Sequence, residues 1–115
     1  MRIAIIGSRA YPWPENVKLA VDFLCQEVPG WVLVSGGAKG PDSWSEEYAK
    51  DRGVQTIIFL PDWAKFGKRA GMVRNHDIVG QADLIIAFWD GFSRGTKYSI
   101  DLARSQGKPV WTVLA

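Results

Sequence analysis

Long apolar runs and repeated cysteines are both missing from this 115-residue chain. The single cysteine, Cys25, excludes an internal disulfide, and its place in a helical apolar stripe predicts a small core residue. No apolar run approaches the ~20 residues of a membrane-spanning helix, so no membrane partner is expected. The apolar start, residues 1–6, is too short for a signal peptide, and we therefore expect a cytoplasmic protein.

Charge of one sign is also scarce, because 14 Lys and Arg residues are nearly balanced by 12 Asp and Glu residues. The formal net charge is +2, and no block of like charges suggests an arm that binds nucleic acid. We therefore do not expect nucleic acid as a partner. With one histidine and one cysteine, the chain has no metal-ligand pattern, and we predict no metal site.

Short apolar runs alternate with amphipathic segments along the whole chain. The runs of strand length cover residues 2–6, 31–34, 55–60, 84–89 and 109–114. The helical patterns cover residues 15–28, about 41–52, a segment ending near 80, and 96–106. This alternation predicts an α/β fold in one domain, residues 1–115. We expect a Rossmann-like, doubly wound parallel sheet of five strands in the order 3-2-1-4-5, with helices on both faces.

The chain is rich in tryptophan, with six residues of this type. Trp31 and Trp111 lie in strand-like runs, which predicts core positions. Trp13, Trp63 and Trp89 lie at or near strand ends and loops. Each of these can either stack on a base in a pocket or close the rim of the core.

Three of the predicted strands end in segments rich in glycine and small polar residues, each leading towards a helix. In a parallel sheet these segments meet at one edge, where glycine allows close approach of a ligand and helix N-termini offer free N–H groups. In the first segment, Gly7, Ser8 and Arg9, the hydroxyl and the guanidinium can both bind a phosphate. A plain turn with a solvated arginine is the alternative. The segment matches neither a dinucleotide fingerprint nor a Walker A sequence.

The second segment contains Ser35, Gly36, Gly37, Lys39, Gly40 and Asp42. Its adjacent glycines free the backbone to bind phosphate, and Lys39 adds positive charge. Asp42 can accept a hydrogen bond from a ribose hydroxyl or cap the next helix, and the two roles are equally favoured. Ser43 and Glu46 have the spacing of a capping box.

The third segment contains Asp90, Gly91, Ser93, Arg94, Gly95 and Thr96. Gly95 and Thr96 would offer N–H groups and a hydroxyl to a phosphate, while Arg94 would neutralise its charge. An ordinary loop with Thr96 as the helix cap is the alternative. Near the same edge, Asn75 lies on the inward face of a helix, so its amide needs a backbone or ligand partner. The base or ribose is expected near Trp63, Asn75 or Trp89.

Together these motifs resemble the YspA-related (DUF2493) branch of the SLOG superfamily. The matching segments are Gly7–Arg9, Ser35–Asp42, Gly67–Asn75 and Ala82–Thr96. The resemblance implies a Rossmann-like domain that senses or processes a nucleotide or an ADP-ribose-like ligand. It implies no other cofactor. It also implies self-association into a homo-oligomer.

The chain is more distantly similar to the Lonely-Guy, or lysine-decarboxylase-like, enzymes, which cleave the N-glycosidic bond of nucleoside monophosphates. Arg74 matches their arginine in its spacing from the pair Ala82 and Asp83, which implies a catalytic role. Ser99 stands where those enzymes have a glutamate, so Asp90 or Asp42 would have to supply the carboxylate. The superfamily also includes the DprA proteins, which gives a third alternative, a module that binds single-stranded DNA.

Overall fold

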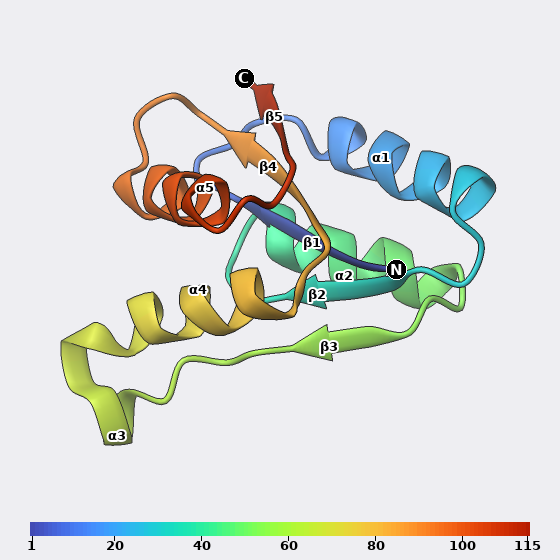
Figure 1. The fold of residues 1–115 in the computed structure, drawn as a ribbon. Coiled ribbons are helices and arrows are strands. Elements are labelled where there is room, and N and C mark those ends of the chain that lie inside the picture. The colour runs from blue at the N-terminus through green and yellow to red at the C-terminus, as the bar shows by residue number, and fades with distance from the viewer.

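A parallel sheet lies between two layers of helices in the computed structural model, which describes residues 1–115 (Figure 1). The strands are β1 (Arg2–Gly7), β2 (Val32–Ser35), β3 (Thr56–Ile58), β4 (Leu84–Trp89) and β5 (Val110–Leu114). The helices are α1 (Pro14–Glu27), α2 (Pro41–Asp51), α3 (Trp63–Phe66), the 3-10 turn η1 (Gly67–Arg69), α4 (Ala70–Gln81) and α5 (Arg94–Ser105). None of these helices has the length and apolar character needed to cross a membrane.

The strands pair in the order β3-β2-β1-β4-β5, and every pair is parallel. The predicted Rossmann-like fold class and strand order are therefore confirmed. From β1 the chain adds β2 and then β3 on one side of the sheet, and it then crosses to the other side of β1 to add β4 and β5. The carboxyl ends of β1 and β4 therefore form the topological switch point, the place where open α/β sheets bind ligands.

Both faces of the sheet are covered, which explains why its central strands are continuous apolar runs. Successive side chains of a strand point to opposite faces. Ile3 and Ile5 of β1 pack in a cluster with α1 and α2, while Ala4 and Ile6 pack in a second cluster with α4 and α5. Cys25 is partly buried against the first cluster, in agreement with its predicted place in the core.

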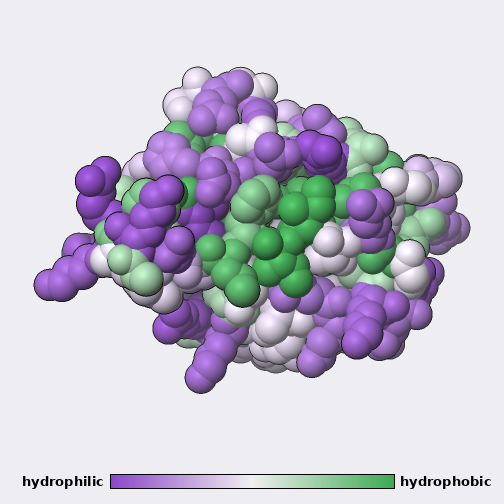
Figure 2. All heavy atoms as spheres, turned by 90° about the horizontal axis from the view of Figure 1, so that it is seen from below, coloured by the Kyte–Doolittle hydropathy of each residue, from purple (hydrophilic) through white to green (hydrophobic).

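The outer strand β3 is shorter than the predicted run of residues 55–60. Ile58 is 46% exposed and Leu60 is 70% exposed, because an edge strand has a neighbour on one side only. Figure 2 shows the molecule from below, the side on which β3 lies in Figure 1, and hydrophobic residues gather near the middle of this face. The segment between β3 and α4 forms the short helix α3, where the Asp62 carboxylate accepts a 3.0 Å hydrogen bond from the N–H of Lys65.

The two tryptophans predicted in the core have different environments. Trp31 is buried, with 3% of its surface exposed, as predicted. The prediction for Trp111 is wrong, since this side chain is 48% exposed. Trp111 lies on β5, the outer strand on the other side of the sheet, where flanking cover is incomplete.

Candidate functional site

A cavity of about 340 Å³ lies at the switch point between the ends of β1 and β4. This volume falls in the lower part of the range of about 300–1,000 Å³ typical of small-molecule sites. The predicted site residues that line it are Gly7, Arg9, Asp42, Arg74, Asn75, Asp90, Ser93, Gly95 and Thr96. They come from the loops after β1 and β4, the first turns of α2 and α5, and α4.

A second hollow of about 500 Å³ adjoins the cavity and shares part of its lining. We call it the basic groove, after Arg9, Lys39, Lys68 and Arg74, which line it. The other predicted site residues along it are Gly36, Gly37, Trp63, Asn75 and Gly95. Arg9 and Arg74 line both hollows, so their guanidinium groups are placed to serve a ligand in either one.

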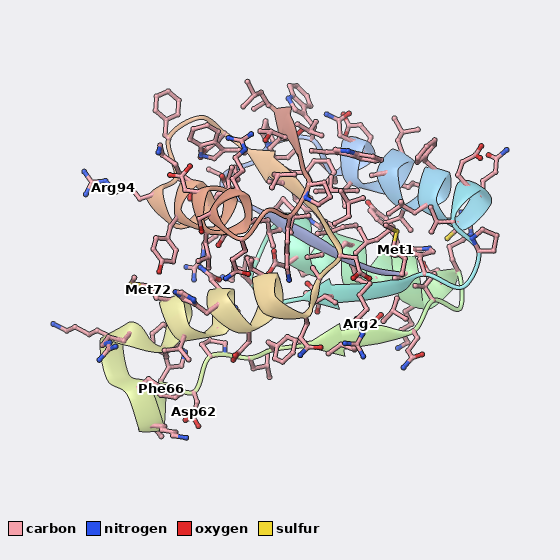
Figure 3. The ribbon with its side chains drawn as sticks, in the orientation of Figure 1. Met1, Arg2, Asp62, Phe66, Met72 and Arg94 are labelled. Carbon is pink, nitrogen blue, oxygen red and sulfur yellow. The ribbon has the colours of Figure 1, made fainter.

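The remaining predicted site residues line neither hollow; they are Ser8, Ser35, Gly40, Trp89, Gly91 and Arg94. Ser8 lies buried beneath the cavity, where its Oγ accepts a 3.2 Å hydrogen bond from the N–H of Asp90 and lies 3.3 Å from Thr96 Oγ1. The Arg94 side chain is exposed and points away from the body of the molecule (Figure 3). Its charge therefore lies outside the cavity.

The N–H groups of the glycine loop after β2 already donate to carboxylates of α2. The N–H groups of Gly36 and Ala38 donate to Asp42 Oδ2 at 3.2 and 3.3 Å, and the N–H of Gly37 donates to Glu46 Oε2 at 3.1 Å. A phosphate can bind these three N–H groups only by displacing the two carboxylates. In this conformation the loop therefore presents an acidic side chain to the cavity.

Glu46 has a different role from the one its sequence spacing predicted. Ser43 lies inside α2 and its hydroxyl donates to the carbonyl of Gly40 at 3.2 Å, so no capping box forms. Glu46 Oε2 instead accepts a 2.6 Å hydrogen bond from Ser35 Oγ. Glu46 follows Asp42 by one helical turn, which places both carboxylates on one face of α2. That spacing is the signal that identifies Glu46 as a partner of the loop.

Asp42 is a buried acid in the wall of the cavity, with 5% of its surface exposed. Burial raises its pKa from 3.8 to about 6, and the negative charge of Glu46 adds to this effect. Hydrogen bonds from the N–H groups of Ala38 and Gly36 and the positive charge of Arg74 act in the opposite direction. The second carboxylate oxygen, Oδ1, makes no hydrogen bond within the protein.

Arg74 connects α4 to the glycine loop. Its Nη1 donates to the carbonyl of Gly36 at 2.6 Å, and its Nε donates to Asn75 Oδ1 at 3.0 Å. The amide of Asn75 thus has a protein partner at its oxygen and lines the cavity. A Cβ on Gly36 would lie 2.7 Å from Arg74 Nη1, so this contact requires glycine at that position.

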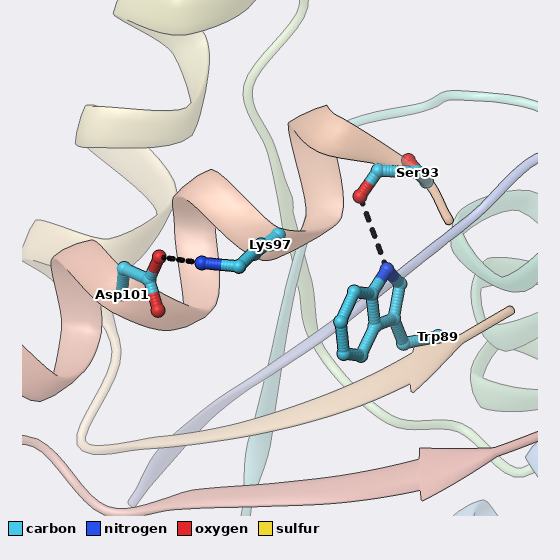
Figure 4. A network of polar contacts seen from close by, with 4 residues as sticks. All are labelled: Trp89, Ser93, Lys97 and Asp101. Carbon is cyan, nitrogen blue, oxygen red and sulfur yellow. Dashed lines mark hydrogen bonds and ion pairs between the residues drawn. The ribbon is translucent and has the colours of Figure 1, made fainter. Parts of the chain in front are cut away.

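The loop after β4 is held by hydrogen bonds of its own. Trp89 Nε1 donates to the carbonyl of Ser93 at 3.0 Å (Figure 4). Asp90 Oδ1 accepts two hydrogen bonds of 2.8 Å, from the N–H groups of Phe92 and Ser93. These two bonds lower the pKa of Asp90. The loop is therefore fixed at the point where it delivers the chain to α5.

The first turn of α5 provides an open donor to the cavity. Ser93 is the N-cap, and its Oγ accepts a 3.4 Å hydrogen bond from the N–H of Thr96, so Thr96 is not the cap. The N–H of Gly95 makes no hydrogen bond within the protein. A Cβ added at Gly95 would meet no atom within 4 Å. This end of the helix therefore has both a free donor and room for a ligand.

The cavity also contains residues that the sequence did not identify as ligand-binding; they are Ile6, Ala10, Ala38, Ile78 and Ser99. In the sequence, Ser99 stands out only as the position where the distant enzymes have a glutamate. It is 4% exposed, and its position one turn after Thr96 on the same face of α5 is the signal that places it here.

Comparison with known proteins gives matches over different parts of the chain. Residues 1–66 match the model of the YspA, cpYpsA-related SLOG family. The Gene 61 protein of Mycobacterium phage D29 is 35% identical over 116 residues, which cover 95% of this chain and 93% of that protein.

Two solved structures of DNA processing protein A (DprA) are similar in fold. The Streptococcus pneumoniae protein has a TM-score of 0.77 at 22% identity, and 96% of this chain covers 49% of that chain. The Helicobacter pylori protein has a TM-score of 0.79 at 24% identity, and 97% of this chain covers 64% of that chain. The present chain thus spans about half of the length of the first neighbour and 64% of the length of the second.

One expectation about partners is corrected by this comparison. The near-neutral charge had led us not to expect nucleic acid as a partner. The Helicobacter pylori protein, which has the same fold, is described as binding single-stranded DNA. That expectation is therefore wrong, because a protein of this fold can bind nucleic acid. The net charge of +2 is a property of the whole chain, and it does not reveal a local groove lined by four basic side chains.

Proposed function

Since the chain belongs to the YspA, cpYpsA-related SLOG family, we propose that residues 1–115 form one domain that binds a nucleotide or nucleotide-derived ligand in the cavity. The observation that carries this proposal is the unpaired N–H of Gly95 in the first turn of α5, at the wall of the cavity. The N-terminus of a helix carries partial positive charge and suits a phosphate. Arg9, which lines the same cavity, adds a full positive charge.

The test compares variants inside and outside the cavity by calorimetric titration with a panel of nucleoside mono- and diphosphates. Gly95→Ala adds a methyl group that meets no protein atom within 4 Å, so it obstructs the ligand without disturbing the fold. Arg9→Ala removes the charge. Both variants should weaken binding about tenfold or more, because Arg9→Ala removes a hydrogen bond from a charged group and the Gly95→Ala methyl keeps the phosphate away from the N–H.

Arg94→Ala is the matched control, because its side chain carries the same charge and points away from the molecule (Figure 3). This variant should bind like the wild type. Mass spectrometry of small molecules released from the denatured protein would identify a ligand retained through purification. If Gly95→Ala and Arg9→Ala both bind every nucleotide as the wild type does, the phosphate does not bind at α5.

A second candidate, binding of single-stranded DNA, is supported by the basic groove. Four basic side chains line it, and Trp63 beside them is 58% exposed. Positive charge for the backbone and an aromatic ring for stacking are the two elements of non-specific single-strand binding. The same fold in a protein described as binding single-stranded DNA adds weight to this candidate.

Fluorescence anisotropy with a labelled thymidine oligonucleotide tests this candidate. Affinity should fall as salt rises, and the double variant Lys39→Ala, Lys68→Ala should bind more weakly with a shallower salt dependence. The double variant Lys18→Ala, Lys50→Ala is the control that removes equal charge at exposed positions outside the groove, and it should have no effect. Absence of binding at low salt would exclude the candidate.

Cleavage of the N-glycosidic bond remains the enzymatic alternative. The observation that favours it is that Asp42, a buried carboxyl, lines the same cavity as Arg74. Asp42 could supply the carboxylate that the related enzymes have as a glutamate at the position of Ser99. Incubation with each nucleoside monophosphate and chromatography of the product would reveal a free base. The alternative requires that Asp42→Asn abolishes the release, and it fails if no monophosphate yields a base.

A further inference from the structure

We propose that the part of the cavity lined by Asp42 and Ser99 is a ribose subsite, which recognises the sugar of the ligand through its hydroxyl groups. The inference rests on the proposed nucleotide-binding function and adds the identity and placement of the sugar. The phosphate would lie at the start of α5, near Gly95, and the ribose would extend towards the first turn of α2. Both ends line the one cavity.

Asp42 supplies an acceptor without a partner of its own. Its Oδ2 is used by the N–H groups of Gly36 and Ala38, at 3.2 and 3.3 Å, and these two bonds fix the orientation of the carboxylate. Its Oδ1 makes no hydrogen bond within the protein, although the residue is 5% exposed. Above pH 6 the carboxyl is ionised and can only accept, so its ligand partner must be a donor such as a sugar hydroxyl.

Ser99 is an independent observation at the same wall. Its side chain lines the cavity, the residue is 4% exposed, and its hydroxyl makes no hydrogen bond within the protein. Other serines within helices, such as Ser45 and Ser105, donate to the carbonyl three residues earlier. The Ser99 oxygen itself is open to the cavity, since Trp31 Nε1 is the buried side-chain polar atom that lacks a partner. A ligand group that both donates and accepts can therefore bind this hydroxyl in place of water.

The charged groups of the cavity favour a ribose near Asp42 and a phosphate near Gly95 over the opposite orientation of the ligand. Arg74 donates to the carbonyl of Gly36 and to Asn75, so two of its five N–H donors are used within the protein. A phosphate beside Asp42 would meet a buried negative charge and N–H groups already in use. A hydroxyl beside Asp42 meets neither obstacle. Asp90 also lines the cavity, but it is more exposed, so water can still reach its free oxygen when a ligand is bound.

Burial makes the Asp42 subsite selective. A bound ligand excludes the water that hydrogen-bonds to Asp42 in the free protein. If its sugar lacks the hydroxyl that contacts Asp42, no ligand group replaces that hydrogen bond. The carboxylate is then left without a partner, and sites of this kind reject the deoxy analogue. We expect a ribonucleotide to bind about tenfold or more tightly than its deoxy counterpart, because one buried hydrogen bond to a charged group is lost.

The experiment measures the ratio of dissociation constants for ribose and deoxyribose forms by calorimetry at pH 7.5. The probes are AMP and GMP, their 2′-deoxy forms and 3′-deoxy-AMP. In the wild type, at least one of the deoxy forms should bind about tenfold more weakly than the matched ribonucleotide. Asp42→Asn retains an oxygen that can accept from the N–H groups of Gly36 and Ala38. It replaces Oδ1, the acceptor that faces the ligand, with an NH₂ donor, so the ratio of deoxyribose to ribose dissociation constants should fall towards one. Ser99→Ala should reduce it as well, and Ser105→Ala, an exposed serine of the same helix, should leave it unchanged.

The outcomes separate this inference from the function on which it rests. Equal binding of ribo and deoxy forms by the wild type would overturn the ribose subsite and leave nucleotide binding intact. Absence of binding by every probe would overturn both. The wild-type comparison needs no variant, so an unstable Asp42→Asn protein would not prevent the decision. Tighter binding of the deoxy forms would also overturn the subsite and would favour DNA as the ligand.

Discussion

Asp42 accepts, at its Oδ2 atom, a 3.2 Å hydrogen bond from the N–H of Gly36, so a buried carboxylate closes the loop that precedes its own helix. Glu46 makes a similar contact to Gly37, one helical turn further along α2. The loop whose glycines suggest phosphate binding is thereby filled by side chains of the protein. The cavity has a donor end at α5 and an acceptor end at α2 as a result.

The stability of the protein should depend on pH through Asp42. Its pKa is about 6 in the folded protein against an ordinary value of 3.8, so the folded state binds this proton more tightly than the unfolded chain does. Its contribution to the free energy of unfolding is therefore greatest below pH 4 and falls as pH rises to 6. The full change is roughly 3 kcal/mol, since one pKa unit corresponds to about 1.4 kcal/mol.

Asp42→Asn should consequently gain stability relative to the wild type as pH rises from 4 to 7, measured by urea unfolding. Asp90→Asn is a control of opposite sign, because hydrogen bonds from Ser93 and Phe92 lower the pKa of Asp90. That variant should lose stability relative to the wild type at neutral pH, and the loss should vanish as the pH falls below 3.8. A difference between Asp42→Asn and wild type that stays constant with pH would contradict the assignment.

Gly7 should be the glycine least tolerant of substitution at the site. A Cβ there would collide with the ring of Pro41 and would lie 2.7 Å from the carbonyl oxygen of Phe88. Gly7→Ala should lower the free energy of unfolding by about 1–3 kcal/mol, the usual effect of overpacking. Gly80→Ala is the matched control, since no atom lies within 4 Å of its Cβ and the position is in α4. It should raise stability by up to about 1 kcal/mol, and a similar loss in both variants would show that the contact with Pro41 is not the cause.

Trp89 should matter for the position of α5. Trp89→Phe removes the 3.0 Å hydrogen bond to the carbonyl of Ser93 and should lower stability by about 1 kcal/mol. Ligand affinity should fall with it, because the loop that holds the start of α5 loosens. Lys97→Ala breaks the exposed 2.7 Å ion pair with Asp101 on the same helix (Figure 4) and should change stability by about 0.5 kcal/mol or less. Thermal unfolding and calorimetry measure both effects, and unchanged affinity in Trp89→Phe would exclude the positioning role.

The central strands could be predicted closely because they are defined by their own residues. The apolar runs 2–6 and 84–89 correspond to β1 (Arg2–Gly7) and β4 (Leu84–Trp89), and both are buried on two faces. The edge strands were predicted less well. The length of β3 and the exposure of Trp111 depend on what neighbouring elements cover, and this information is not local in the sequence.

The site could be predicted as a set of segments but not as a set of contacts. Glycine and polar residues after β1, β2 and β4 indicated the right edge of the sheet, because parallel strands bring their carboxyl ends together. The partners of Asp42, Glu46 and Arg74 depend on how α2 and α4 pack against the loop. The same is true of Arg94, whose charge suggested the cavity and whose side chain lies outside it.

The closed glycine loop has a consequence for the kinetics of binding. Fixing the backbone of a flexible residue costs about 1–2 kcal/mol in conformational entropy. Because Asp42 and Glu46 already hold Gly36, Gly37 and Ala38, this entropy is lost during folding and not when a ligand arrives. Association should therefore occur in a single kinetic phase whose rate rises linearly with ligand concentration, without a slow ordering step.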